Sequence, residues 1–313
     1  MRSILLDTDI GSDVDDALAL GVALASPELR LVGVTCVARI ARRRAAAAAR
    51  LLGIAGRGDV PVFVGEDEAL LRKERFAWRE IEDQGLPPGP DAPILGEPAP
   101  EAIVRLAREV PGLELVAIGP LTNLARALAL DPKLPKRVAG LTLMGGHVRQ
   151  VRIGKLLCEP GIDYNLCSDP EASMAVLGAG FATRLVTADV TLETWLTRAD
   201  LARLAAAGAL PRALAALVRI WTPWQEKIFT DLGGSLDPEN VAFLHDPLTV
   251  QALVDPAPLR FERLRILPTI ERGVLRTLEV PPDSGLGAEM EVATAVAARE
   301  ASQAILERLL RLP

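Results

Sequence analysis

Short apolar, β-branched runs alternate with longer Ala-, Leu- and Arg-rich stretches along this chain. The short runs predict strands at residues 3–6, 31–37, 60–64, 114–118, 140–144 and 183–186. The longer stretches predict helices at residues 15–25, 43–53, 101–109, 123–130, 170–178 and 201–217. This alternation indicates a mostly parallel central sheet flanked by helices, and near-continuous apolar strands fit it because such strands are buried on both faces.

The chain shows no internal repeat and no low-complexity linker. We interpret the Pro- and Gly-rich stretch at residues 86–100 as a surface loop, because the alternation resumes after it. The expected architecture is therefore one α/β domain over residues 1–313, with a Rossmann-like sheet. Ligands of such folds bind at the carboxyl ends of the strands, so polar residues that follow strands are the candidates for function.

Five aspartates lie within ten positions directly after the first predicted strand. They are Asp7, Asp9, Asp13, Asp15 and Asp16. Carboxylates this close together repel one another unless a cation neutralises them. Oxygen ligands favour Ca²⁺ or Mg²⁺ over zinc. Helix caps and turns would explain one or two of the aspartates, and an EF-hand is disfavoured because Gly11 is misplaced and no Glu closes the loop.

Composition narrows the possible partners. The chain of 313 residues has a formal net charge of −6, and it lacks a basic stripe interleaved with aromatic residues, which disfavours nucleic acid. We interpret the Arg run at residues 42–44 as a solvated helix face. No apolar span has transmembrane length and no signal-peptide core is found, so we expect a cytoplasmic protein without a membrane partner. The three cysteines show no metal-ligand spacing, and we expect no disulfide.

The aspartate loop resembles the opening motif of the nucleoside hydrolase family of the inosine-uridine preferring type, Asp-x-Asp-x-Gly…Asp-Asp-Ala, lengthened by about two residues. The resemblance implies the nucleoside hydrolase fold and a bound Ca²⁺. Asp9 and Asp16 would be calcium ligands, and Asp9 would also be the general base that deprotonates a calcium-bound water. Asp15 would hydrogen-bond a ribose hydroxyl, and Asp7 would support the loop from behind.

Two motifs in the middle of the chain extend the resemblance. Gly-Pro-Leu-Thr-Asn at residues 119–123 matches a family turn in which the carbonyl of Thr122 would bind calcium; an ordinary helix cap by Thr122 is the alternative. Leu-Met-Gly-Gly at residues 143–146 would place Met144 against the ribose.

A further stretch resembles the family's Glu-Phe-Asn…Asp-Pro-Glu-Ala. Here it reads Asp-Tyr-Asn and then Asp-Pro-Glu-Ala. Asn165 would hydrogen-bond ribose hydroxyls, and Asp163 would face the 5′ end of the ribose. Asp169 is instead expected to be a helix N-cap, with Pro170 at the first helical position.

The last motif is His-Asp-Pro, which begins at His245. By resemblance Asp246 would be the final calcium ligand and His245 a proton donor to the leaving base, whereas a satisfied core histidine is the alternative. Trp221, Trp224 and Phe229 lie on a helix-like stretch before the motif and could stack on a base, with core packing as the alternative.

Three departures from the family pattern concern the ribose pocket. Arg39 and Ile40 replace a Gly-Asn pair, Leu157 replaces an Asn after a longer loop at residues 148–159, and Asp163 replaces a Glu. An unpaired substrate hydroxyl costs roughly 1–3 kcal/mol. One hypothesis is therefore a substrate with a modified 5′ end, whose anionic group Arg39 or Arg152 could hold.

The motifs occur in family order over about three quarters of the chain. They imply a hydrolase that cleaves the N-glycosidic bond of a ribonucleoside, acting in purine or pyrimidine salvage as a homodimer or homotetramer. Acidic residues suit this reaction because positive charge builds on the ribose as the bond breaks. Two alternatives stay open: a non-catalytic calcium- and ribosyl-binding homologue, and a phosphohydrolase built on the Asp-x-Asp motif, which would need a later Lys and Mg²⁺.

Overall fold

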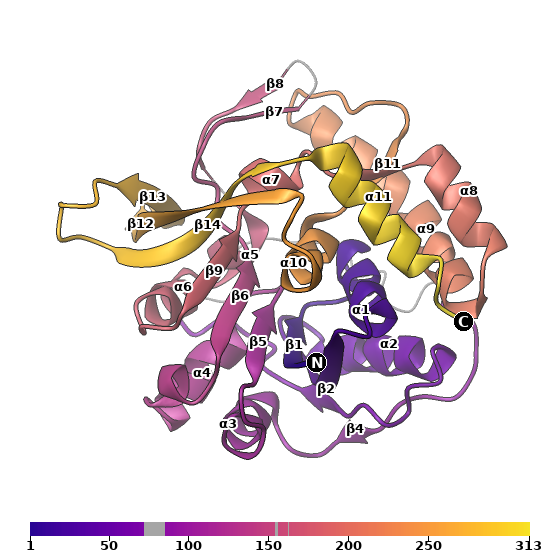
Figure 1. The fold of residues 1–313 in the computed structure, drawn as a ribbon, viewed down its shortest axis with the longest axis horizontal. Helices are drawn as coiled ribbons and strands as arrows, with labels where there is room; N and C mark the ends of the chain where they lie inside the picture. Colours follow the sequence, from indigo (N-terminus) through magenta and orange to yellow (C-terminus); the bar gives the residue numbers. More distant parts are fainter. Residues whose placement is uncertain (72–84, 154–155, 162) are drawn as a thin grey trace.

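A computed structural model describes residues 1–71, 85–153, 156–161 and 163–313 of the chain, and a ten-stranded sheet forms the centre of this part (Figure 1). The strand order is β13-β12-β14-β9-β6-β5-β1-β2-β3-β4. These strands are β1 (Arg2–Thr8), β2 (Leu29–Cys36), β3 (Val62–Val64), β4 (Ile94–Leu95), β5 (Glu114–Ala117), β6 (Gly140–Met144), β9 (Thr183–Val186), β12 (Leu259–Glu271), β13 (Val274–Val280) and β14 (Ala288–Val296).

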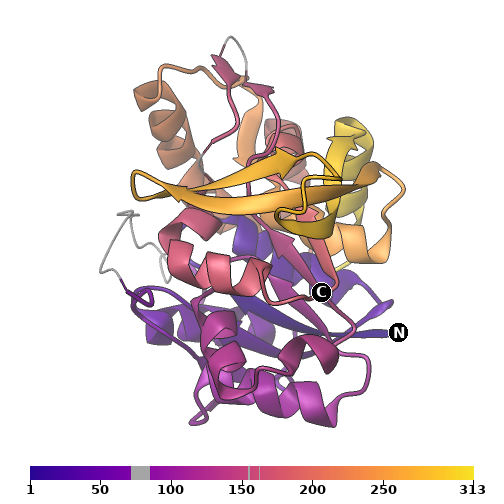
Figure 2. The same ribbon diagram turned by 90° about the vertical axis from the view of Figure 1, so that its left-hand side faces the viewer.

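The sheet is mostly parallel, as the sequence predicts. All neighbouring pairs from β14 and β9 through to β3 and β4 are parallel, whereas β12 pairs antiparallel with both β13 and β14. The central strands are apolar because helices cover both of their faces: every residue of β6 is buried. Figure 2 shows β12 and β14 as long strands, in orange to yellow, that extend beyond the parallel part.

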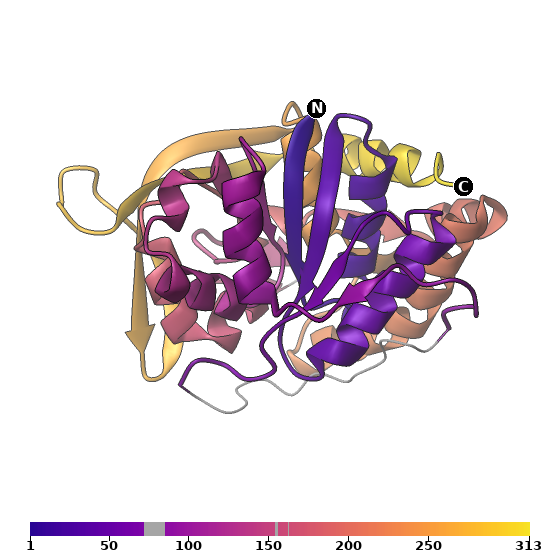
Figure 3. The same ribbon diagram turned by 90° about the horizontal axis from the view of Figure 1, so that it is seen from below.

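Helices form a layer on each face of the sheet. They are α1 (Asp15–Ala25), α2 (Ala41–Ile54), α3 (Ala99–Glu109), α4 (Thr122–Leu130), α5 (Tyr164–Ser168), α6 (Pro170–Leu177), α7 (Ala188–Thr191), α8 (Arg198–Ala206), α9 (Ala209–Asp231), α10 (His245–Val254) and α11 (Ala298–Leu309). Figures 1 and 3 show α2 and α3 on opposite faces. Each layer has its own hydrophobic core: α1, α2, α9, α10 and α11 contribute to one, and α3, α4 and α6 to the other.

Several predicted boundaries agree with the structure to the residue, namely those of α1, β6 and β9. The single helix expected at residues 201–217 is wrong, because α8 ends at Ala206 and α9 begins at Ala209. Between them the carboxyl terminus of the chain comes very close. A Cβ atom on Gly208 would lie 2.2 Å from the carbonyl carbon of Pro313, and Leu210 N donates to Pro313 O at 2.9 Å.

Two stretches interpreted as loops contain short strands. The loop at residues 86–100 includes β4, which pairs with β3. The loop at residues 148–159, two of whose residues lie outside the described part, includes β7 (Val151–Ile153) and β8 (Leu156–Cys158), which form an antiparallel pair. A second small pair joins β10 (Trp195–Thr197) to β11 (Asn240–Phe243). Within the described residues, no helix is long and apolar enough to cross a membrane.

Candidate functional site

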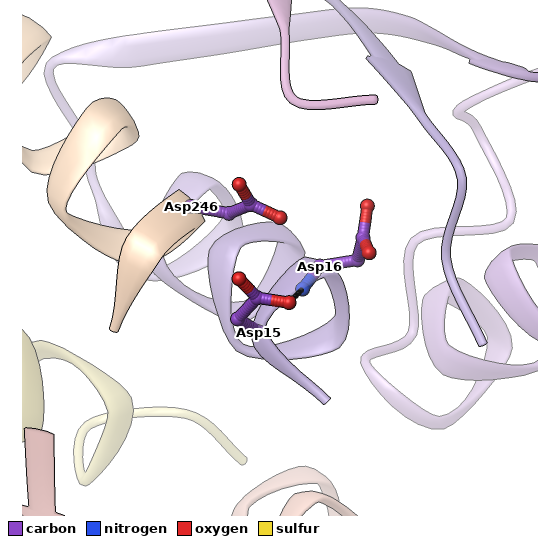
Figure 4. A group of neighbouring side chains, drawn as sticks. All are labelled: Asp15, Asp16 and Asp246. Carbon is purple, nitrogen blue, oxygen red and sulfur yellow. Dashed lines mark hydrogen bonds between the residues drawn. The ribbon is translucent and has the colours of Figure 1, made fainter. Parts of the chain in front are cut away.

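Three aspartates from two helix starts meet at the carboxyl edge of the sheet. Asp15 and Asp16 lie in the first turn of α1, and Asp246 lies in the first turn of α10 (Figure 4). One carboxylate oxygen of each lies within 4.8 Å of the other two. A helix amino terminus favours negative charge, which accounts for part of this arrangement. The expected gathering of carboxylates distant in sequence is therefore present, and it includes Asp15, which the resemblance had placed on the ribose alone.

The three carboxylates fit a hard divalent cation. All three side chains are buried, and Asp246 Oδ1 has no hydrogen-bond partner among the described residues. Burial, reinforced by the charge of neighbouring aspartates, raises the pKa of Asp15, Asp16 and Asp246 well above its ordinary value. A cation bound among them would remove the repulsion and give the buried oxygens a partner. An all-oxygen donor set suits Ca²⁺ or Mg²⁺.

Asp9 follows β1 and lines the same cavity as these carboxylates, although it lies outside the group of three. Burial raises the pKa of Asp9 to about 6, and the positive charge of Arg44 partly offsets this effect. The turn after β5 packs directly against it, since a Cβ atom on Gly119 would lie 2.6 Å from Asp9 Oδ1.

Arg44 lies behind the aspartate loop and is almost fully buried. Its Nη1 donates to the carbonyls of Asp9 and Ile10, and its Nε donates to the carbonyl of Ala38 at 2.9 Å. Its Nη2 donates to Ser12 Oγ at 3.1 Å. The interpretation of residues 42–44 as a solvated face is therefore wrong for Arg44, whose fork of donors joins the loop after β1 to the loop after β2.

Asp7 and Asn123 form a second buried connection beneath the loop. Asp7 Oδ1 accepts hydrogen bonds from Thr35 Oγ1 at 2.6 Å and Asn123 Nδ2 at 2.7 Å. Asn123 Oδ1 also accepts from the backbone N–H of Glu66 at 2.9 Å. Burial raises the pKa of Asp7 to about 7. Asp7 thus supports the loop from behind, while Asn123, to which sequence reasoning gave no role, ties three strand ends together.

The expected roles of Thr122 and Asp169 can be compared with their contacts. Thr122 is the first residue of α4, whose N-cap is Leu121 without a side-chain cap, so the alternative of Thr122 as a helix cap is wrong. Its hydroxyl donates to Asp169 Oδ2 at 2.8 Å. Asp169 caps α6 by accepting from Ala172 N at 3.0 Å, which confirms that prediction. Calcium binding by the Thr122 carbonyl stays a prediction.

A cavity of about 190 Å³ opens beside the carboxylates. Carboxylates and aromatic or apolar side chains together form its wall. Its described lining residues are Asp9, Ser12, Asp13, Asp15, Asp16, Ile118, Met144, Tyr164, Asn165, Trp221, Gln225, Ile228, Phe229, Phe243, His245 and Asp246. This combination of carboxylate and aromatic side chains can hold a ligand with a polar, hydroxylated part and a flat apolar part.

Three residues expected at a ribose differ in their placement. Met144 and Asn165 line the cavity, where Asn165 Nδ2 donates to the carbonyl of Ile118 at 2.9 Å. Asp163 lies outside the described lining. It is buried and caps α5 by accepting from Leu166 N at 2.9 Å, and burial raises its pKa to about 6.

The aromatic residues of α9 serve the cavity and the core. Trp221 and Phe229 line the cavity, and Trp221 also belongs to the buried hydrophobic core, against which Trp224 packs. Gln225, which sequence reasoning missed, also lines the cavity. Its amide is held by Asn240 Oδ1 at 3.0 Å and by the backbone N–H of Phe243 at 2.9 Å, so it fixes β11 against α9.

His245 is the first residue of α10 and lines the cavity. Its Nδ1 lies 2.7 Å from Thr191 Oγ1, and its ring packs against Phe243 with centroids 5.3 Å apart. Burial lowers the pKa of His245 to about 4. The ring is therefore neutral near pH 7, and it lies between Phe243, against which it packs, and Asp246, the next residue of α10.

Comparison with known proteins identifies the family of this chain. The family described as inosine-uridine preferring nucleoside hydrolase matches residues 4–302. A probable uridine nucleosidase from Arabidopsis thaliana is 32% identical over 270 residues, covering 82% of this chain and 78% of the relative.

The chain belongs to the nucleoside hydrolase family.

Solved structures show that the described residues of this nucleoside hydrolase have the family fold. A plant nucleoside hydrolase, PpNRh1, superposes with a TM-score of 0.84 at 27% identity and covers 99% of both chains. A purine-preferring ribonucleoside hydrolase from Gardnerella vaginalis superposes with a TM-score of 0.82 at 25% identity and covers 98% of both. The expected fold class, a mostly parallel sheet flanked by helices, is confirmed.

The residues that depart from the family pattern, and Arg152, are not among the described residues that line the cavity of this nucleoside hydrolase. Arg39 is half-buried, Arg152 is exposed on β7, and Leu157 is exposed on β8. None of the described residues that line the cavity is a Lys or an Arg. The structure therefore gives no support to a bound anion at this site.

Proposed function

We propose that this nucleoside hydrolase cleaves the N-glycosidic bond of a ribonucleoside to give ribose and a free base, with the help of a divalent cation that we take to be Ca²⁺. One observation carries the proposal. Asp15, Asp16 and Asp246 converge from two distant segments beside a cavity that His245 and Trp221 also line. The ribose would lie against the carboxylates, and the base would lie against the aromatic side chains.

The charge of the site favours the transition state over the substrate. Positive charge builds on the ribose as the bond to the base breaks, whereas the substrate itself is neutral. The carboxylates that line the cavity outnumber the charge of one divalent ion. Their excess negative charge therefore stabilises the ribosyl cation. When bound, the cation would supply charge neutralisation among Asp15, Asp16 and Asp246 and would make a nearby water more acidic.

Asp9 is suited to take the proton of the attacking water, because it lines the cavity and burial holds its pKa at about 6. Asp15, Asn165 and Met144 would hold the ribose, and the carbonyl of Thr122 would complete the ligands of the cation. The water oxygen forms a bond to C1′, and the electron pair of the broken bond stays with the base. His245 would donate a hydrogen bond to the base nitrogen as negative charge builds there, and the proton that the departing base takes up from solvent balances the one that Asp9 accepts.

The base would lie against Trp221 and Phe229, whose rings offer faces for stacking. Aromatic stacking tolerates both purines and pyrimidines, and the relatives differ in the same way, since one is named for uridine and another for purine preference. We expect the reaction to serve the salvage of bases. We also expect a homodimer or homotetramer, and light scattering on the purified protein would measure this oligomeric state.

The experiment is a screen for release of free base. The protein, stripped with EDTA and then given Ca²⁺, is incubated with purine and pyrimidine ribonucleosides and with their 5′-phosphates, and products are separated by liquid chromatography. We expect base release from unphosphorylated ribonucleosides that depends on the cation. Asp9→Asn should lower kcat by about 10²–10⁴-fold because the general base is lost.

The same screen distinguishes the alternatives. Calcium binding without base release from any compound would identify a non-catalytic binding protein. Phosphate release would support a phosphohydrolase, which the site disfavours because Asp7 is engaged behind the loop and no described lining residue is a Lys. Preferred cleavage of the 5′-phosphates would support the hypothesis of a modified 5′ end.

A further inference from the structure

His245 is held by a hydroxyl from a different part of the chain. Thr191, the last residue of α7, is fully buried, and its Oγ1 lies 2.7 Å from His245 Nδ1. We propose that Thr191 is a positioning residue, which holds the imidazole of His245 in the tautomer and orientation that present an N–H at Nε2 to the leaving base. This inference rests on the proposed function of His245.

The position of the Thr191 hydroxyl is fixed on both sides of the contact. Within α7, Thr191 N donates to the carbonyl of Thr187 at 3.1 Å, and Ala188 N donates to the carbonyl of Gly146 at 2.8 Å. On the other side, Leu244 N donates to the carbonyl of Thr194 at 3.0 Å, which holds the residue before His245 against the segment after α7. The distance between hydroxyl and ring is therefore set by backbone contacts.

The direction of the hydrogen bond follows from the acceptors near the hydroxyl. A neutral imidazole has one N–H donor and one bare nitrogen acceptor. The Thr191 hydroxyl lies 2.7 Å from Nδ1 and 3.5 Å from the carbonyl of Ala188, so Nδ1 is the better acceptor for its hydrogen. When Nδ1 accepts this hydrogen, the ring proton must be on Nε2.

This tautomer suits the departure of the base. The C1′–N bond breaks, its electron pair goes to the base nitrogen, and an N–H at Nε2 can donate to that nitrogen as its charge grows. The ring of Phe243 packs against the imidazole with an angle of 33° between the planes, which limits its rotation. Without the hydroxyl, Nδ1 could carry the proton instead, and the nitrogen facing the base would then repel it.

The test compares two substrates that differ in whether the leaving group needs a hydrogen-bond donor or a proton as it departs. One is the ribonucleoside cleaved best in the screen. The other is p-nitrophenyl riboside, whose nitrophenolate departs without a proton. Thr191→Val should lower kcat for the nucleoside by about tenfold or more and should change kcat for the nitrophenyl riboside by less than about twofold, since loss of one hydrogen bond is worth roughly a factor of ten.

Matched variants separate positioning from folding. Thr191→Ser keeps the hydroxyl and should restore nucleoside cleavage. Thr194→Val removes another buried hydroxyl of the same segment, one that donates to the carbonyl of Thr191 at 3.0 Å and not to the imidazole, and it should leave the ratio of the two rates unchanged. An equal loss on both substrates in Thr191→Val, or no loss, would overturn the inference.

A measurement without activity tests the tautomer directly. The chain has only two histidines, so ¹⁵N-labelled imidazoles give two sets of signals, and His147→Asn assigns them. We expect His245 to show a protonated Nε2 and a bare Nδ1 in the wild-type protein. A proton on Nδ1 would overturn the inference even with full activity. Failure of the wild-type protein to cleave either substrate would instead refute the proposed function and, with it, the role of His245 on which this inference rests.

Discussion

Close contacts between backbone segments set the position of Asp9. The turn after β5 approaches so closely that a Cβ atom on Gly119 would lie 2.6 Å from Asp9 Oδ1 and 2.8 Å from Asp9 N. The second distance is to a backbone atom, which a side-chain rotation cannot relieve. Glycine at this position is therefore a requirement of packing at the site rather than of backbone conformation.

Gly119→Ala should displace Asp9 and lower kcat by at least tenfold while the protein stays folded. Overpacking of this kind costs roughly 1–3 kcal/mol of stability, so thermal unfolding should show a modest decrease. Gly96→Ala is the control, since a Cβ atom there meets nothing within 4 Å. Wild-type kinetics in Gly119→Ala would show that the turn after β5 accommodates the added methyl group without displacing Asp9.

Arg44 acts on the same loop through charge and hydrogen bonds. Arg44→Met keeps most of the side-chain volume but leaves the carbonyls of Asp9, Ile10 and Ala38 without their buried donor. Each hydrogen bond to a charged group is worth about 1.5–3 kcal/mol, so the free energy of unfolding should fall by roughly 3 kcal/mol or more in denaturant titrations. Arg42→Met, two residues earlier on the exposed face of α2, should change it by less than about 0.5 kcal/mol.

At the scale of elements, one carboxylate joins two helices across a turn. Asp131 follows α4, and its Oδ2 accepts from Arg108 of α3 at 2.7 Å and from Arg137 at 2.7 Å. Its side chain is 6% exposed, whereas both arginines are far more exposed. Hydrogen bonds from Arg108, from the backbone N–H of Lys133 and from Arg137 lower the pKa of Asp131 to about 2.

This lowered pKa predicts a direction for acid stability. A carboxylate with a folded pKa below its unfolded value stabilises the protein above the unfolded pKa, near 3.8, and this contribution is lost as the pH falls toward 2. The difference in melting temperature between the wild type and Asp131→Asn should therefore be full at pH 7 and should shrink below pH 4. A difference that is constant from pH 7 to pH 3 would show that charge is not its origin.

At the scale of the whole molecule, the acidic cluster couples cation binding to stability. The three carboxylates come from α1 and α10, so a cation bound among them joins segments from both ends of the chain. Ca²⁺ at 100 times its dissociation constant should stabilise the fold by about 2.7 kcal/mol. Differential scanning fluorimetry with and without EDTA measures the effect.

Substitution of one ligand should remove this stabilisation. Asp246→Asn should shift the calcium dependence of the melting temperature to much higher concentration, while raising the melting temperature without calcium because one buried charge is gone. Asp283→Asn, on an exposed loop, is the control for net charge and should keep the wild-type dependence. An unchanged dependence in Asp246→Asn would place the cation elsewhere.

The sequence by itself determined the parallel part of the fold and the neighbourhood of the site. Apolar runs and helical periodicity depend on neighbouring residues, so the boundaries of α1, β6 and β9 could be predicted. The density of aspartates after β1 is local too, and it indicated a cation before any contact was known. The antiparallel extension by β12 and β13 was not predicted, because strands with one exposed face carry a weaker apolar pattern.

Only the tertiary structure decided which partners meet. Arg42, Arg43 and Arg44 are the same residue type, yet only Arg44 is buried. The orientation of α2 relative to the loop after β1 places only the Arg44 side chain against that loop. Asp163 caps α5, and the hydroxyl of Thr191 contacts the ring of His245, which is remote in the sequence. A buried donor or acceptor takes the partner that the packing of remote segments brings to it, and no local pattern of residues contains that information.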